Sequence, residues 1–286
     1  MILPRTTQTT AEVGRHYDEL HRYYLGLWGE HVHHGLWLHG DETPEQATRQ
    51  LVAVLADRLA LQPGERVCDI GCGYGATARL LAEERAIDVV GMTISQEQFR
   101  YASSALPATP QGTCEFLLQD WLENTFQAET FDAVYAIESS EHMPDKPRCF
   151  AEMFRVLKPG GRAAVYAWLA RERPSAWQVD WLLAPICTEG RLPGMGTETE
   201  YRQWFAAAGF REIVYTDFSR QVRKTWRLCA GRLARLFLAD ADARHFALRG
   251  PENRVFAKTV FRIWCAYRLG TMRYGLFTAE KGASTP

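Results

Sequence analysis

The sequence predicts an α/β fold with a seven-stranded, mostly parallel sheet, helices at its N-terminus and an inserted helical cap. Between residues 62 and 168, short apolar runs rich in β-branched residues alternate with helical stretches. This alternation is typical of parallel strands joined by crossover helices. A glycine-rich turn, 71–75, follows the first run, at a place where open α/β sheets bind ligands. The 286 residues, 47% of them apolar, are enough to bury the core of one large domain.

The elements of this central segment follow from local residue preferences. The run 66–70 (RVCDI) has the apolar character of a buried strand, and Ser95 is a typical N-cap for a helix. The segment 158–161 (KPGG) is expected to end a helix and turn the chain. The predicted order is strand 66–70, helix 76–84, strand 88–92, helix 95–104, strands 114–118 and 132–137, helix 147–156 and strand 162–168.

The flanking segments have a different character. Residues 1–61 are helical and rich in histidine and aromatic residues, and strands at 212–216 and 272–279 complete the sheet of seven. Apolar residues recur at helical spacing between these two strands. On the first helical face they are Trp226, Cys229, Leu233, Leu236 and Phe237, and on the second they are Phe256, Val260, Ile263, Trp264 and Tyr267.

Composition excludes several classes of protein. The chain has 33 Lys and Arg against 34 Asp and Glu, a formal charge of −1, which argues against a general nucleic-acid binder. Seven cysteines are spread along the chain without a C-x-x-C pair, which fits a reducing cytoplasm. The N-terminus lacks the features of a signal peptide, and no apolar run reaches the roughly 18 residues of a membrane span. We therefore expect a cytoplasmic protein.

The most informative motif is the turn 69–75 (DIGCGYG), where the first strand becomes the first helix. Glycines let the backbone approach a ligand closely, and the helix N-terminus behind them favours polar or anionic groups. A dinucleotide-binding turn is the rival interpretation. Here, however, the third glycine comes one residue early, and Asp69 lies directly at the strand end. A carboxylate there suits a cationic amino group better than a pyrophosphate.

This arrangement resembles the first motif of the Rossmann-like S-adenosylmethionine-dependent methyltransferases. After the second strand, 91–98 (GMTISQEQ) resembles the G-x-T-x-S-x-x-Q form of small-molecule methyltransferases and cyclopropane fatty acid synthases. Thr93 replaces the usual acid, which weakens the NAD interpretation. The resemblance implies that Thr93 and Gln98 contact the ribose or methionine end of S-adenosylmethionine. It also implies that Asp120 binds the adenine amino group while Trp121 covers the ring; the alternative is a solvated loop acid beside a core tryptophan.

The resemblance extends beyond the glycine turn. The string 137–146 (IESSEHMPDK), the later 155–161 (RVLKPGG) and the N-terminal 28–35 (WGEHVHHG) resemble the γ-tocopherol methyltransferases and their small-molecule relatives. Taken together, these motifs imply S-adenosylmethionine as the cofactor. The implied cofactor-binding residues are Tyr17, His33, His34, Asp69, Gly71, Cys72, Gly73, Thr93, Ile94, Gln98, Asp120, Trp121 and Ile137.

The end of the fourth strand carries the expected catalytic residues. His142 and Glu141 are the first candidates for a general base and Glu138 the next, because a base helps when the attacking atom carries a proton. In the related cyclopropane synthases, the acid that matches Glu141 belongs to the polar network of the reaction site. The alternative role for Glu138 and Glu141 is helix capping or positioning of the substrate.

Six of the eight histidines lie within the first 39 residues. His31, His33 and His34 have ligand types that transition metals bind, but no further ligands are evident, and we predict no metal. The family resemblance instead implies a lid, in which Tyr17, His33 and His34 close over the methionine end of the cofactor. Packing is the third alternative.

Residues 220–273 contain thirteen Lys and Arg against three acids, a formal balance of +10. Such helices can bind an anionic membrane peripherally, cap a site for an acidic acceptor, or expose a solvated outer face. Since the family builds its acceptor pocket here, we expect these helices and 169–208 to form an apolar chamber. Its expected lining is Trp177, Trp181, Trp204, Trp226 and Trp264.

The sequence thus predicts a methyltransferase that transfers a methyl group to carbon, nitrogen or oxygen of a small, apolar or aromatic acceptor. An NAD-dependent oxidoreductase and a non-catalytic, methyltransferase-like binding protein are the alternatives. Neither nucleic acid nor metal is an expected partner. The predicted division is an N-terminal helical lid (1–61), a cofactor-binding core (62–168), an acceptor-side insertion (169–208), a core strand (209–219), a basic helical cap (220–270) and a last core strand with tail (271–286).

Overall fold

The computed structural model describes residues 1–105, 111–239 and 251–283, and its centre is a seven-stranded sheet with the strand order β3-β2-β1-β4-β5-β7-β6. Only β7 runs antiparallel to its neighbours, β5 and β6. The strands are β1 (Arg66–Ile70), β2 (Asp88–Thr93), β3 (Thr113–Leu118), β4 (Phe131–Ile137), β5 (Leu157–Ala170), β6 (Arg211–Asp217) and β7 (Met272–Glu280). The predicted α/β class and mostly parallel sheet are confirmed.

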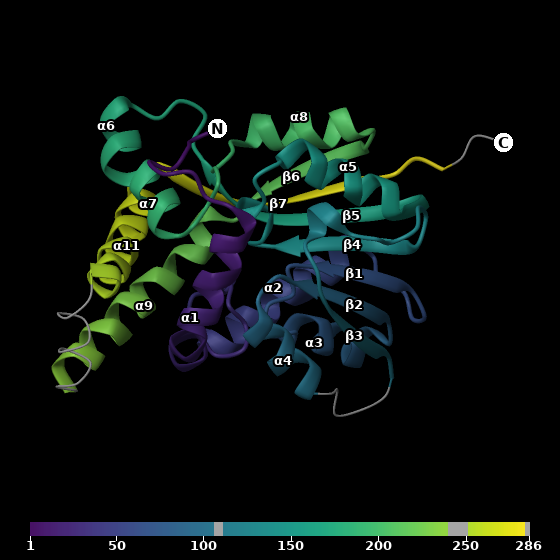
Figure 1. Cartoon of the computed structure of the whole chain (residues 1–286), viewed down its shortest axis with the longest axis horizontal. Helices are drawn as coiled ribbons and strands as arrows, with labels where there is room; N and C mark the ends of the chain where they lie inside the picture. The colour runs from purple at the N-terminus through teal and green to yellow at the C-terminus, as the bar shows by residue number, and fades with distance from the viewer. Residues whose placement is uncertain (106–110, 240–250, 284–286) are drawn as a thin grey trace.

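Helices cover both faces of the sheet (Figure 1). The longer helices are α1 (Thr10–Trp28), α2 (Pro44–Arg58), α3 (Ala76–Arg85), α4 (Gln96–Ser104), α5 (Lys146–Val156), α8 (Glu198–Ala208), α9 (Ser219–Ala239) and α11 (Pro251–Arg268). Shorter turns are η1 (Trp121–Glu123), η2 (Ser140–His142), α6 (Ala176–Gln178), the π-helical η3 (Val179–Leu183) and α7 (Ala184–Glu189).

Strand alternation divides the core into two clusters. Tyr166 of β5 packs into the first cluster with α2, α3, α9 and α11, and its neighbours Val165 and Ala167 pack into the second with α5 and α8. Successive side chains of a strand point to opposite faces, so the two clusters lie on opposite sides of the sheet. Of the expected faces in 220–268, Trp226, Val260, Ile263 and Tyr267 are buried in the first cluster.

One expectation about a boundary is wrong. The segment 158–161 was expected to turn the chain, but β5 begins directly after α5, at Leu157. Leu157 pairs with Phe131, and the register shifts before Ala133 pairs with Arg162. Gly160 absorbs this irregularity with a φ of 77°, and its N–H donates to the carbonyl of Lys281. Proline and glycine therefore distort the start of a strand here, in place of a separate loop.

Parts of the outer helices lie outside the residues that the structure describes. Residues 240–250, which belong to the predicted cap, lie outside the described residues, as do the side chains of Leu233, Leu236, Phe237 and Phe256. Within the described part of the chain, no helix is both long and apolar enough to cross a membrane.

Candidate functional site

The glycine turn after β1 forms a tight cradle. Gly71, Gly73 and Gly75 all have positive φ, at 79°, 55° and 73°, a region that residues with a Cβ rarely adopt. A Cβ on Gly71 would lie 2.4 Å from the Cβ of Ser139, and the N–H of Cys72 donates to the carbonyl of Met92 at 2.8 Å. The turn is therefore fixed between the ends of β2 and β4, and its backbone faces outward from the sheet edge.

Asp69 ends β1 beneath this cradle with an unsatisfied oxygen. Its side chain is 2% exposed, and Oδ2 has no hydrogen-bond partner among the described residues. Burial raises the pKa of Asp69 to about 7, because the charged form loses its hydration. A buried acceptor without a donor is unfavourable, so the site fits a ligand that brings its own hydrogen-bond donor or positive charge.

A pocket that is partly open to solvent is lined by Asp69 and by the glycine turn. Six predicted cofactor residues line it: His33, Asp69, Gly71, Cys72, Gly73 and Ile137. Five others were not predicted to bind cofactor: Glu30, His31, Val32, Ala76 and Thr77. The cavity therefore lies between the first βα turn and the N-terminal segment 30–33.

The N-terminal segment is tied down over the cavity by polar contacts. Glu30 accepts hydrogen bonds from Arg79 at 2.7 Å and from the Tyr101 hydroxyl at 2.8 Å. Both His31 and His33 place a ring nitrogen 3.4 Å from Oγ1 of Thr77. Burial lowers the pKa of His31 to about 3, so its ring is neutral at pH 7. Among the residues that the structure describes, no group of three His, Cys, Asp or Glu side chains is placed to hold a metal.

The motif after β2 joins the cradle to α1. Oγ1 of Thr93 donates to Oε1 of Gln98 at 2.8 Å, and Ser95 caps α4 as expected. Asp18 of α1 accepts from Oγ of Ser95 at 2.6 Å and from the N–H of Glu97. At Gly14, α1 approaches the carbonyl of Ile94 so closely that a Cβ would lie 3.0 Å from it. Residues of the predicted cofactor motif therefore also hold α1 in place.

Asp120 and Trp121 are placed differently from each other. Asp120 is half-buried and caps η1, where its Oδ1 accepts from the N–H of Leu122 at 2.9 Å. The Trp121 ring is 3% exposed within the second core cluster, and its Nε1 donates to the carbonyl of Cys149 at 3.1 Å. This placement favours the alternative of a core tryptophan, while cofactor contact by this pair stays a prediction.

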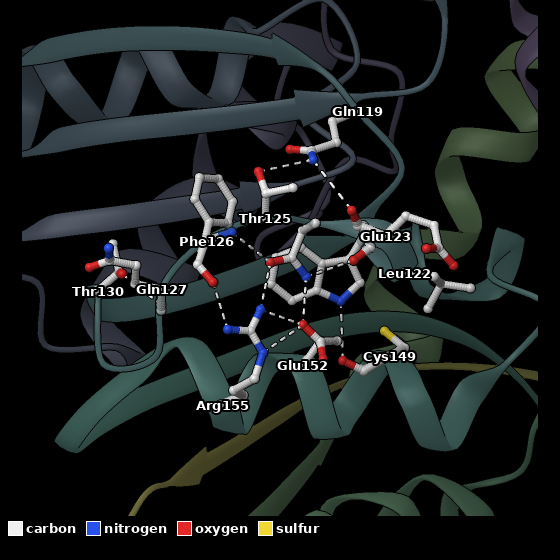
Figure 2. A network of polar contacts seen from close by, with 12 residues as sticks. Gln119, Leu122, Glu123, Thr125, Phe126, Gln127, Thr130, Cys149, Glu152 and Arg155 are labelled. Carbon is white, nitrogen blue, oxygen red and sulfur yellow. Dashed lines mark hydrogen bonds and ion pairs between the residues drawn. The ribbon is translucent and has the colours of Figure 1, made fainter.

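Arg155 of α5 fixes the loop that follows Trp121. It donates to the carbonyl of Phe126 at 2.6 Å, to Oδ1 of Asn124 at 2.8 Å and to the carboxylate of Glu152 (Figure 2). This residue begins the 155–161 motif, but no role was predicted for it from the motif. The structure shows a brace that holds the loop beside the cofactor-binding edge.

Glu138 lies at the end of β4 with a positive φ of 54° and accepts four hydrogen bonds. Oε1 receives the main-chain N–H and Nδ1–H of His34 at 2.8 and 2.9 Å, and the Tyr274 hydroxyl at 2.7 Å. Oε2 receives the indole N–H of Trp168 at 2.7 Å. Burial acts to raise the pKa of Glu138, but attraction and hydrogen bonds from His34 outweigh it, and the pKa falls to about 2.

His34 in turn connects the N-terminal segment to the helical cap. Its Nε2 accepts the indole N–H of Trp226, on α9, at 2.6 Å. An indole nitrogen can only donate, so Nε2 accepts in this contact and Nδ1–H is the group that donates to Glu138. Trp168, Trp226, Tyr267 and Tyr274 surround the ring at centroid distances of 4.7–5.7 Å. Every polar atom of the His34 and Glu138 side chains thus has a hydrogen-bond partner in the protein. These contacts favour the alternative in which Glu138 positions other groups.

Glu141 is also buried, in the η2 turn. Its carboxylate accepts from the N–H of Trp168 and from Oγ of Ser140, whose hydroxyl also contacts Tyr201 at 2.9 Å. Burial raises the pKa of Glu141. The carboxyl therefore lies between β5 and η2, with few free acceptor sites.

Lys146, for which no role was predicted, holds this turn in place. Its ammonium, 1% exposed, donates to three main-chain carbonyls, those of Ser140, Glu141 and Met143, at 2.7–2.9 Å. Three carbonyls of one short turn converge on one cation, so the turn is fixed in one conformation. A lysine just before Pro147 at a helix start is a weak signal, because such lysines are normally exposed.

His142 has the arrangement of a general base. Its Nδ1 lies 3.2 Å from the carbonyl of Arg191, and its Nε2 lies 3.0 Å from the Tyr17 hydroxyl. A carbonyl oxygen can only accept a hydrogen bond, so Nδ1 carries the proton. Nε2 is therefore unprotonated and accepts a hydrogen bond from the Tyr17 hydroxyl. Burial lowers the pKa of His142 to about 4, so this neutral form predominates at pH 7.

The expected tryptophan-lined chamber is wrong in part. Trp177 and Trp181 are 52% and 74% exposed. Trp204 stacks on Phe150 in the second cluster, on the opposite face of the sheet from Trp226. Of the five tryptophans, Trp226 of α9 and Trp264 of α11 belong to the helical cap and pack in or against the first cluster.

The strand order with one reversed strand, the glycine turn and the acid at the end of β1 define a class I methyltransferase fold with an S-adenosylmethionine site. The model of the family described as mycolic acid cyclopropane synthetase matches residues 4–239. The chain belongs to this family of S-adenosylmethionine-dependent methyltransferases. It is therefore an enzyme that methylates small molecules with S-adenosylmethionine as donor, and the NAD and non-catalytic alternatives are wrong.

Known proteins resemble the chain over nearly its whole length. The 27-O-demethylrifamycin SV methyltransferase of Amycolatopsis mediterranei is 32% identical over 277 residues, 96% of this chain and 99% of that protein. The crystal structure of the [4+2]-cyclase SpnF superposes with a TM-score of 0.80 at 28% identity. The match covers 99% of this chain and 100% of the SpnF chain. The cyclopropane synthase CmaA1, complexed with SAH and CTAB, has a TM-score of 0.84 at 22% identity over 96% and 99% of the two chains.

Proposed function

We propose that the enzyme methylates a hydroxyl oxygen of a small, apolar or aromatic acceptor, and that His142 is the general base. The observation that carries this proposal is the hydrogen bond from the Tyr17 hydroxyl to the unprotonated Nε2 of His142. A base contributes when the attacking atom loses a proton during the reaction, which is the case for a hydroxyl. The similarity to a protein named as a 27-O methyltransferase supports attack by oxygen.

The cofactor site is proposed to be the cavity beside Asp69. The Asp69 carboxyl would accept from the cationic amino group of S-adenosylmethionine, and the cradle of Gly71 and Gly73 would let the cofactor approach the backbone. Thr93, Ile94, Gln98, Asp120 and Trp121 remain the proposed contacts at the ribose and adenine end. Segment 30–33 would cover the cofactor and exclude water.

The proposed proton path runs through Tyr17. S-Adenosylmethionine would supply a sulfonium methyl group, whose carbon the acceptor oxygen attacks directly while S-adenosylhomocysteine leaves as the thioether. As the new C–O bond forms and the C–S bond breaks, the acceptor proton passes to the Tyr17 oxygen while Tyr17 gives its own proton to Nε2 of His142. Burial raises the pKa of Tyr17, so a free tyrosinate is unfavourable and the two transfers are expected to be concerted. Glu138 and Glu141 hold His34 and the η2 turn in place.

A screen of metabolite extracts with methyl-labelled S-adenosylmethionine tests this proposal. Labelled products are isolated and the methylated atom is identified by mass spectrometry and NMR. We expect an O-methyl product whose formation falls sharply in Tyr17→Phe and His142→Ala. A C-methyl or N-methyl product, or turnover that is unchanged in both variants, would overturn it.

We also propose peripheral contact of the positively charged stretch 220–273 with an anionic membrane. Arg220, Arg223, Arg227 and Arg235 are all exposed along α9, and such cations are attracted to anionic lipid. Co-sedimentation with anionic liposomes at low and high salt tests this: salt-insensitive pelleting or none would contradict it. A reducing cytoplasm remains the proposed location, supported by seven cysteines that are all free.

A further inference from the structure

Exposed apolar side chains gather at the end of the molecule that carries α6, η3 and α11. Nine large apolar side chains are exposed in the described part of the chain. Three of them, Trp177, Trp181 and Phe261, belong to these elements, and Leu269 directly follows α11; all four are 52–74% exposed. Isolated exposed apolar residues are ordinary, but a gathering that includes two tryptophans indicates an interaction surface.

Polar contacts hold these elements side by side. Nε2 of Gln178, next to Trp177, donates to Oγ1 of Thr271 at 2.9 Å, two residues after Leu269. Arg262, next to Phe261, pairs with Glu189 on α7, which directly follows η3. Figure 1 shows α6, α7 and α11 at one end of the molecule, with the N-terminus nearby. We call the surface of Trp177, Trp181, Phe261 and Leu269 the aromatic face.

The exposure of Trp181 follows from an anchored turn. Trp181 lies in the π-helical η3, and the two residues that follow it, Leu182 and Leu183, are 8% and 0% exposed in the first core cluster. Single π-turns are rare and occur often at functional sites. The turn is therefore fixed by its buried leucines while the indole of Trp181 faces solvent at 74% exposure.

The charges around the aromatic face are mainly positive. Arg171, Arg173, Lys258 and Arg268 are exposed on or beside the same elements, against Glu172 and Asp180. The main-chain N–H of Arg171 donates to the carbonyl of Thr271 at 2.9 Å, so the backbone of residue 171 lies next to the segment that follows α11. A second copy of the chain would present the same positive charge, so this excess disfavours self-association through the face and favours an anionic partner.

We propose that the aromatic face docks into the headgroup region of an anionic lipid bilayer, with its indoles in the interface and its cations on the lipid phosphates. Tryptophan prefers this depth because its ring is apolar and its N–H remains hydrated. Arginine and lysine extend from such a surface to the phosphates. This inference rests on the peripheral contact proposed above and assigns insertion to a different face from the charged α9.

Vesicle flotation of the full chain tests the assignment, without cofactor or acceptor, so that its result is separate from methyl transfer. The vesicles are phosphatidylcholine alone or mixed with phosphatidylglycerol. We expect binding to the mixed vesicles, and a loss of about tenfold or more in partition for Trp177→Ser/Trp181→Ser, since each indole loses buried apolar area. The matched control Leu118→Ala/Val214→Ala alters exposed apolar residues elsewhere and should stay within about twofold.

A third variant, Arg223→Glu/Arg227→Glu, separates the two faces. If it abolishes vesicle binding while the tryptophan variant binds like the parent chain, the aromatic face is not the inserted one and the proposal fails. The proposal also fails if the parent chain does not bind mixed vesicles. A concentration-dependent dimer that the tryptophan variant loses would identify the face as a contact between copies. Circular dichroism and thermal melting confirm that each variant is folded.

Discussion

The Tyr17 hydroxyl lies 3.0 Å from Nε2 of His142, although 125 residues separate them in the sequence. The two rings meet edge to face at a centroid distance of 5.5 Å. Tyr17 belongs to α1, which contacts the predicted cofactor motif through the hydrogen bond between Asp18 and Ser95. His142 belongs to the η2 turn, whose carbonyls bind the ammonium of Lys146. The pair therefore links the N-terminal helix, the cofactor edge and the turn after β4.

We predict that His142→Ala lowers kcat by roughly 10²-fold or more, because it removes the proposed base that takes the Tyr17 proton as Tyr17 takes the proton of the acceptor. Tyr17→Phe, which deletes only the relaying hydroxyl, should produce a loss of similar size. The dissociation constant of S-adenosylmethionine, measured by calorimetry, should be unchanged in His142→Ala. His39→Ala, at an exposed histidine, is the control. Full turnover in His142→Ala would remove the base role.

The pH profile of kcat provides an independent check. Burial lowers the pKa of His142 to about 4, from about 6.5. A base is active in its neutral form, and a lowered pKa keeps that form populated to lower pH. We therefore expect kcat to stay level between pH 7 and about pH 5 and to fall only below that range. A decline centred near pH 6.5, absent from His142→Ala, would contradict the buried, neutral ring.

Asp69→Asn should change both stability and cofactor affinity. Burial raises the pKa of Asp69 to about 7, so between about pH 4 and pH 7 the folded state binds more protons than the unfolded state. Stability must then fall as the pH rises through this window. At pH 8 we expect Asp69→Asn to be more stable by on the order of 2 kcal/mol, with weaker binding of S-adenosylmethionine. Urea unfolding at pH 5 and 8 and calorimetry measure these effects; an unaltered pH slope would contradict the shift.

Gly71→Ala should disrupt the cradle, because its Cβ would lie 2.4 Å from the Cβ of Ser139 at a φ of 79°. We expect a loss of about 2 kcal/mol or more in the free energy of unfolding and the loss of cofactor binding. Gly231→Ala is the matched control. Gly231 lies within α9 with nothing within 4 Å of its Cβ position, and alanine should stabilise the chain by about 0.5–1 kcal/mol. Equal effects at the two sites would contradict the close approach.

Glu138→Gln replaces a carboxylate that accepts four hydrogen bonds by an amide that has one oxygen. At least one of the donors from His34, Tyr274 and Trp168 then loses its acceptor, and we expect a loss of about 3 kcal/mol in chemical denaturation at pH 7. The pKa of Glu138 is lowered to about 2, so its stabilisation is present above about pH 4.5 and is lost as the pH falls toward 2. Glu45→Gln, at an exposed position, should show neither effect.

Local patterns were sufficient to predict the sheet. All seven strands were expected within a few residues of their observed bounds, because alternation of apolar and polar residues and the glycine and proline signals are local features. The exception is the start of β5: 158–161 has the composition of a turn, but tertiary pairing with β4 and Lys281 makes it strand. Strand pairing can override such local signals.

Long-range partners were beyond the reach of local patterns. The motif string identified Glu138 and His34 separately, but not that they meet, since 104 residues lie between them. Lys146 and Arg155 were unassigned because a sequence does not show that a cation is buried among carbonyls. For Trp177 and Trp181, the prediction of burial was wrong. Both were expected to line a chamber because they are aromatic residues in an insertion, but both are exposed to solvent in the structure.

The position of β7 has a consequence for biosynthesis. This strand, Met272–Glu280, lies between β5 and β6 although it follows both in the chain. While the ribosome is still adding these residues, one edge of β5 and both edges of β6 have no partner, and exposed strand edges promote aggregation. The nascent chain therefore cannot close its sheet until translation has passed residue 280, and interrupted translation before that point yields a polypeptide that needs chaperone protection.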